Sequence, residues 1–104
     1  MKYEIPTRKL LENFLDVHLH RQLQYRWIVD SDGVVILQIG GVQANAYFHY
    51  GRDNSLYVDI KSSVGFPILV YRNDDWREIT EEDVGKISFK IAQYILTSES
   101  LLHE

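Results

Sequence analysis

Two short segments, 46–50 and 56–61, alternate apolar residues with residues that could bind a partner or catalyse a reaction. If Phe48 and Val58 face a core, alternation sends their neighbours to the opposite face of a sheet. Tyrosine offers a large, stiff contact area with a polar tip, which suits partner surfaces. The pattern, continued into the segment 67–72, predicts a partner-binding face that contains Tyr47, His49, Tyr57, Asp59, Leu69 and Tyr71.

In one register of these two segments, His49 lies opposite Tyr57, and Tyr47 lies opposite Asp59. Asp59 could then orient His49 as a general base, with a tyrosine nearby as an acid. A small-ligand or enzymatic site around His49, Tyr57 and Asp59 is therefore the alternative to a partner face. Cross-strand aromatic pairs also stabilise any half-exposed sheet by about 0.2–1 kcal/mol each, so the pattern is equally compatible with plain surface.

A second candidate is the stretch 74–83, which holds six carboxylates and one arginine. It lacks the alternating acids and central glycine of a calcium loop. Such a stretch is typical of a solvated turn followed by an acid-rich helix start. The alternative is an acidic patch for a basic partner, which Trp76 supports slightly because tryptophan is enriched at interface hot spots, although its side chain could equally pack under the turn. The patch would comprise Asp74, Asp75, Trp76, Glu78, Glu81 and Glu82.

Metal and cofactor chemistry find no support in the sequence. There are no cysteines, and the motifs of nucleotide, phosphate and zinc-protease sites are missing. His18 and His20 are two apart on a helix and so point about 200° away from each other, which prevents them from sharing an ion. We expect His18 to be buried, and we expect no metal, no cofactor and no catalytic residues.

The elements that position these residues follow from their periodicity. A helix is expected from Thr7 to Tyr25, with Leu11 and Leu15 on its apolar arc. A second helix begins after Thr80, where Asp83 completes a variant capping box. Its buried stripe contains Val84, Ile87, Ile91 and Ile95. Between the helices, strands are expected over Arg26–Asp30, Val34–Ile39, Ala46–Tyr50, Leu56–Lys61, Pro67–Arg72 and, as a short edge strand, Trp76–Ile79.

This order predicts a single α+β domain over residues 1–104. Because the turns between strands are short, the strands should form an antiparallel meander of five or six strands. Both helices would pack on one face of the sheet, and the continuous apolar run Val34–Ile39 would be buried on both of its faces. The other face of the sheet would carry the candidate partner surface.

Composition narrows the function classes. The chain has 104 residues, a net charge of −4 and no apolar run long enough to span a membrane. The acidic balance argues against nucleic acid as the partner, and the absence of cysteine and of a secretory signal favours the cytoplasm. We expect a non-catalytic protein-binding protein: an inhibitor, an immunity-type, a chaperone-like or a regulatory accessory protein. An uncovered sheet face also predicts a homodimer, because most soluble oligomers are twofold.

Overall fold

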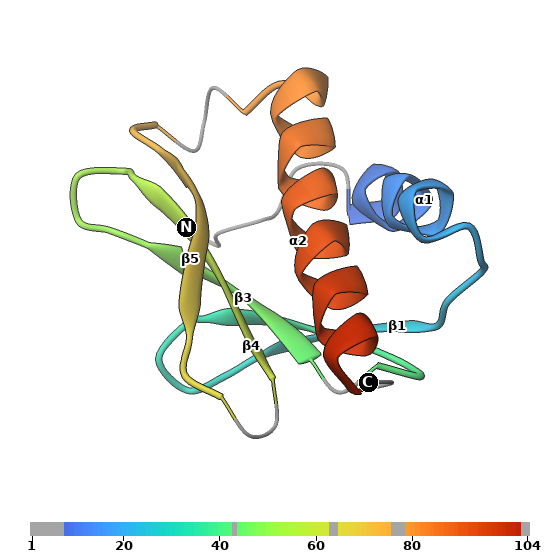
Figure 1. Ribbon diagram of the computed structural model, residues 1–104. Helices are drawn as coiled ribbons and strands as arrows, with labels where there is room; N and C mark the ends of the chain where they lie inside the picture. The colour runs from blue at the N-terminus through green and yellow to red at the C-terminus, as the bar shows by residue number, and fades with distance from the viewer. Residues whose placement is uncertain (1–7, 43, 63–64, 76–78, 103–104) are drawn as a thin grey trace.

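The computed structural model describes residues 8–42, 44–62, 65–75 and 79–102. In chain order, an N-terminal helix is followed by the strands of one sheet and then by a C-terminal helix (Figure 1). The elements in order are α1 (Arg8–Leu19), β1 (Tyr25–Val29), β2 (Val35–Ile39), β3 (Ala44–Tyr50), β4 (Leu56–Ser62), β5 (Ile68–Asn73) and α2 (Glu81–Leu102).

The sheet is an antiparallel meander whose strands lie side by side in chain order, from β1 to β5. Both helices lie on the same side of it, next to each other (Figure 1). The predicted α+β fold is therefore confirmed, with five strands in the described part of the chain. The expected edge strand over Trp76–Ile79 falls mostly on residues 76–78, outside the described residues, and Ile79 is not in a strand.

The core lies between the helices and one face of the sheet. It is built from leucines of α1, alternate residues of β2, β3 and β4, and the predicted stripe of α2. Its members are Leu11, Leu15, Leu19, Val35, Leu37, Ile39, Ala44, Ala46, Phe48, Leu56, Val58, Ile60, Val84, Ile87, Ile91, Ala92 and Ile95.

The expectation that the run Val34–Ile39 is buried on both faces is wrong. In β2, Val35, Leu37 and Ile39 are buried, whereas Ile36 and Gln38 are half-buried. Both helices cover the same face of the sheet, so the apolar side chain of Ile36 is left on the uncovered face.

Helix α1 also ends six residues earlier than the periodicity predicts, and Tyr25 belongs to β1. His20 has a positive φ of 54° and stops the helix. Its N–H bonds the carbonyl of Val17, and the N–H of Arg21 bonds the carbonyl of Asp16. These two bonds form a Schellman motif, which usually places glycine at the left-handed position. A histidine there gives no sequence signal for the end of a helix.

Replacing His20 by glycine should stabilise the protein by about 1 kcal/mol, because a left-handed conformation strains a residue that has a Cβ atom. Urea melts of the wild type and of His20→Gly measure the difference. His20→Ala serves as the control, since it removes the imidazole but keeps the Cβ atom. A glycine variant no more stable than the alanine variant would contradict the assignment of strain to the backbone.

The capping box at the start of α2 forms as predicted. The N–H of Thr80 donates to Asp83 Oδ2 at 2.9 Å, and the N–H of Asp83 donates to Thr80 Oγ1 at 3.2 Å. The hydroxyl of Tyr71 on β5 also donates to Asp83, at 2.7 Å. The hydrogen bond from the Thr80 backbone contributes most to lowering the pKa of Asp83, and the hydrogen bond from Tyr71 contributes next. Asp83 thus caps the helix and joins it to the sheet.

The lowered pKa of Asp83 predicts a pH-dependent contribution to stability. A carboxylate whose pKa is lowered on folding stabilises the protein above its unfolded pKa of about 3.9, and this contribution is lost as the pH falls through the folded pKa. The free energy of unfolding of Asp83→Asn should therefore be about 1 kcal/mol lower than that of the wild type at neutral pH. The difference in free energy between the two should shrink below about pH 4. Urea melts across this range measure it, with exposed Asp32→Asn as control; a pH-independent difference would contradict the prediction.

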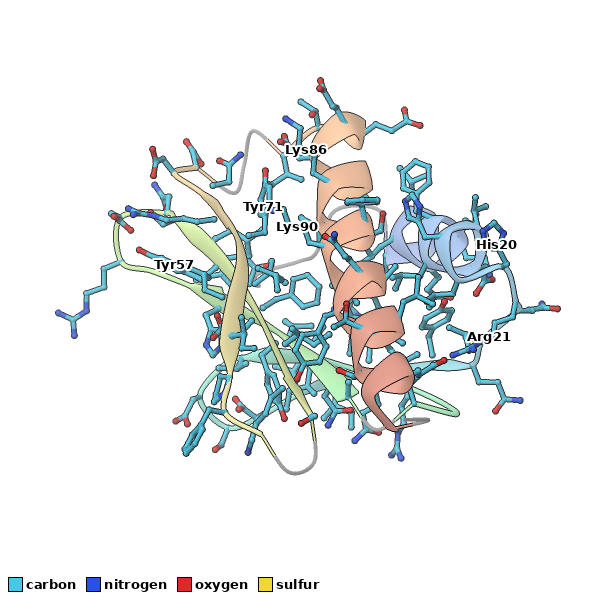
Figure 2. All side chains as sticks on the ribbon, viewed as in Figure 1. His20, Arg21, Tyr57, Tyr71, Lys86 and Lys90 are labelled. Atoms are coloured by element: carbon cyan, nitrogen blue, oxygen red, sulfur yellow. The ribbon has the colours of Figure 1, made fainter. Side chains whose placement is uncertain are left out.

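Polar contacts hold α1 against β1 and α2. Trp27 Nε1 donates to Glu12 at 2.9 Å, and the Tyr25 hydroxyl donates to Asp16 at 2.7 Å. After the end of α1, Arg21 pairs with Glu99 of α2, and this hydrogen bond raises the pKa of Arg21 (Figure 2). With the helices fixed on one side, neither helix covers the opposite face of the sheet.

Candidate functional site: the outer sheet face

The face of the sheet turned away from the helices is called the outer face here. Strand register arranges its side chains in three rows that cross neighbouring strands. The rows are Arg26–Gln38–Asn45–Lys61, Ile28–Ile36–Tyr47–Asp59–Leu69 and His49–Tyr57–Arg72.

Alternation placed five of the six predicted residues correctly, Leu69 of β5 among them. Phe48 and Val58 are fully buried, and Tyr47, His49, Tyr57 and Asp59 are half-buried on the outer face. The register is also the expected one, with His49 opposite Tyr57 and Tyr47 opposite Asp59.

The middle row is largely apolar and crosses all five strands. Ile28, Ile36 and Tyr47 follow one another on β1, β2 and β3. On the far side of Asp59, Leu69 closes the row on β5 with 54% of its surface exposed. Ile28 and Ile36 had not been predicted as site residues, because the alternation in their strands is masked by apolar residues on both faces. The result is an apolar band on an uncovered face.

His49 and Asp59 form a polar pair within this face. His49 Nε2 lies 3.0 Å from Asp59 Oδ2, and the two residues sit diagonally on β3 and β4. The ring of His49 also stacks on that of Tyr47, with centroids 6.4 Å apart. Asp59 therefore has a partner within the chain, so the face can be covered by another surface without leaving this carboxylate unpaired.

Cations border the tyrosines. The guanidinium of Arg72 lies over the ring of Tyr57, 5.4 Å from its centroid. Arg26 and Lys61 are exposed in the row on the other side of the apolar band. The strands thus place three cations and one carboxylate, Asp59, on the outer face of a chain whose net charge is −4.

The predicted place of Tyr71 on this face is wrong. A β-bulge between Val58 and Asp59 shifts the register of β5, so Tyr71 lies opposite Val58 on the helix-covered side. Its hydroxyl binds Asp83 of α2, and burial raises its pKa. One extra residue in a strand reverses the facing of every residue after it, and no turn residue in the segment announces this. The bulge instead brings Arg72 to the outer face.

The predicted acidic patch is only partly described. Trp76 and Glu78 lie outside the described residues. Asp74 is exposed and lies 3.5 Å from Arg72, while Glu82 lies 3.8 Å from Lys86. Asp75 is half-buried and Glu81 is exposed. Asp74 and Glu82 therefore have cations of the same chain beside them, which weakens the case for a purely acidic docking surface.

The three histidines that the structure describes, His18, His20 and His49, do not form a cluster. His18 is half-buried rather than buried, with its ring 5.6 Å from that of Phe89, and His20 is exposed. Among the described residues no group of three or more histidine, aspartate or glutamate side chains could hold a metal ion. In the same part of the chain, neither helix has the length and apolar composition needed to cross a membrane.

Comparison with known proteins adds no relative: no family model, no curated protein and no solved structure matches the chain. The chemistry of the outer face is therefore the basis on which a function is proposed.

Proposed function

We propose that the protein is a non-catalytic protein-binding protein that uses its outer sheet face to bind a partner with an apolar and acidic surface. The main supporting observation is the row Ile28–Ile36–Tyr47–Asp59–Leu69, which is apolar except at Asp59, crosses all five strands and lies on the face that neither helix covers. Contiguous exposed apolar patches mark interaction sites, and tyrosine and arginine are enriched in them. The jobs that fit are inhibitor, immunity-type, chaperone-like or regulatory accessory protein.

Charge favours an outside partner over a second copy on this face. In a twofold dimer the same patch meets itself, so the exposed cations Arg26 and Lys61, which lie in one row, would be brought into the same interface as their counterparts. Like charges brought together at an interface oppose association. An acidic partner surface would complement these cations and leave the apolar band to make the central contact. A homodimer through the outer face remains the second proposal, supported by the band alone.

The alternative of an enzymatic or small-ligand site rests on the pair His49–Asp59, which are 3.0 Å apart. Such a pair can orient an imidazole as a base. A reaction also needs a concave site that excludes water and positions a substrate. The groove between β5 and α2 is lined by other residues, and His49 is not among them. The pair is better explained as an internal polar contact that gives a carboxylate a partner on a face that a protein covers.

Site-specific crosslinking tests the proposal. A photoreactive phenylalanine replaces Tyr57 or, separately, Tyr47, and the variants are irradiated in the native host. The control replaces Asn13, which is exposed on α1. The proposal expects one protein species, with an acidic surface, to be joined at both tyrosine positions and not at position 13. Adducts to nucleic acid would assign the face to a different class of partner, and adducts only to the chain itself would assign it to the homodimer; either result would overturn the proposal.

A further inference from the structure

We infer that a second interaction site lies between β5 and α2, where an extended acidic peptide of a partner protein adds to the sheet beside β5. The site shares Leu69 with the outer face, but it extends toward α2 and does not rest on the function proposed for that face. Its residues come from the edge strand and from the C-terminal half of α2.

The edge strand provides the backbone for such pairing. β5 ends the described sheet and pairs there with β4 alone. An edge strand presents N–H and C=O groups that an extended peptide can bind. Apolar side chains are exposed along the start of this edge: Phe66 is 89% exposed, Ile68 51% and Leu69 54%. Native edges are usually blunted by charge, proline or a bulge. Here Pro67 directly precedes β5 and the bulge lies near Val70, but the first three residues of the strand, Ile68, Leu69 and Val70, carry no charge.

The groove beside β5 provides room for side chains. It has a volume of about 340 Å³ and is lined by Leu69 and Val70 of β5 and by Lys90, Gln93, Tyr94 and Thr97 of α2. In an added strand every second side chain would point toward α2. The helix positions 90–97 span about 10 Å, and alternate residues of a strand are about 7 Å apart. The groove therefore accommodates two alternate side chains of a bound peptide.

Charge at the groove selects the peptide. Lys90 is exposed on its rim, and Figure 2 shows this side chain and Tyr71 in the space between β5 and α2, with Lys86 one turn earlier. Lys86 contacts Glu82, whereas within the described ranges Lys90 makes no ion pair. A carboxylate on the peptide would form an ion pair with Lys90. A second copy pairing through β5 would instead bring two Lys90 rims together across a twofold axis, which is unfavourable.

Peptide binding to the full chain tests the inference. The probes are fluorescein-labelled octapeptides that alternate leucine or valine with threonine and carry one glutamate at each position in turn; a matched set carries lysine. Fluorescence anisotropy should show saturable binding of glutamate peptides, and proline at the centre of the peptide should abolish it because proline lacks a backbone N–H. Lys90→Glu should lower the affinity for glutamate peptides about fivefold to tenfold and should raise the affinity for lysine peptides.

Arg52→Glu is the matched control, because Arg52 is exposed in the turn between β3 and β4, away from the groove. Arg52→Glu changes the net charge by the same amount as Lys90→Glu and should leave the affinity for the peptides unchanged. Thr97→Trp, which fills the groove from the exposed side of α2, should reduce binding without altering the lysine–glutamate preference. Amide shifts confined to β5 and α2 in NMR spectra would place the peptide.

Three results would overturn the inference. One is the absence of saturable binding for every peptide at millimolar concentration. Another is equal loss of affinity in Lys90→Glu and Arg52→Glu. The third is a species of twice the 12.2 kDa chain mass with β5 amides protected from exchange, which would make a second copy the occupant.

Discussion

Replacing Leu15 or Ile91 by alanine is expected to lower the free energy of unfolding by about 2–5 kcal/mol in each case. Both side chains are fully buried, Leu15 on α1 and Ile91 on α2, where the two helices meet the sheet. Truncation removes apolar burial and leaves a cavity that the surroundings fill only in part. Since domains of this kind are stable by roughly 5–15 kcal/mol, either change alone removes a large part of the total.

Two exposed residues on the same helices serve as matched controls. Val17 is 66% exposed on α1 and Leu96 is 46% exposed on α2. Their alanine variants should change stability by about 0.5 kcal/mol or less. Urea melts of the four variants measure the contrast. Losses below 1 kcal/mol for both Leu15→Ala and Ile91→Ala would mean that the helix faces are assigned wrongly.

Replacing Tyr57 by aspartate is expected to weaken binding of the partner roughly 30-fold to 100-fold. Aromatic residues near the centre of an interface commonly account for 2 kcal/mol or more of binding energy, and a charge placed there adds a desolvation cost. Tyr57 also holds the guanidinium of Arg72 over its ring. Loss of the Tyr57 ring would therefore remove an aromatic contact with the partner and would leave the Arg72 guanidinium without the ring that positions it.

The control for Tyr57→Asp is Phe89→Asp, which introduces the same charge at an exposed aromatic residue of α2 on the opposite side of the molecule. Its affinity for the crosslinked partner, measured by calorimetry, should match the wild type. Melting temperatures of both variants separate a lost contact from a lost fold. A Tyr57→Asp chain that is folded and binds with unchanged affinity would remove Tyr57 from the interface.

The central part of the candidate site could be predicted from the sequence because strict alternation in β3 and β4 leaves one choice of face. Burial of Phe48 and Val58 on one face fixes Tyr47 and Tyr57 on the other. The pairing of Tyr47 with Asp59 and of Tyr57 with His49 was one of the registers that this alternation allows, and it is the one observed. The α+β order was predictable for a similar reason, since the periods of helix and strand differ. The capping box of Thr80 and Asp83 is likewise a local pattern with a local cause.

The errors arose where a local conformation overrides periodicity. His20 ends α1 in a left-handed conformation without being glycine, so the helical pattern ran on in the prediction to Tyr25. The bulge in β5 reverses the facing of Tyr71 without a glycine or turn to announce it. The groove between β5 and α2 joins residues 20 or more positions apart in sequence, and no periodicity reports which helix face lies beside which strand.

Oxidative footprinting of the tyrosines measures most directly whether the outer face is the binding surface. Hydroxyl radicals should modify Tyr47 and Tyr57 in the free chain, and addition of the crosslinked partner should protect both, while exposed Phe89 on α2 keeps its rate of modification. Protection of Tyr47 and Tyr57 together is the result the outer-face proposal predicts. Unchanged modification of these two tyrosines at saturating partner would contradict it.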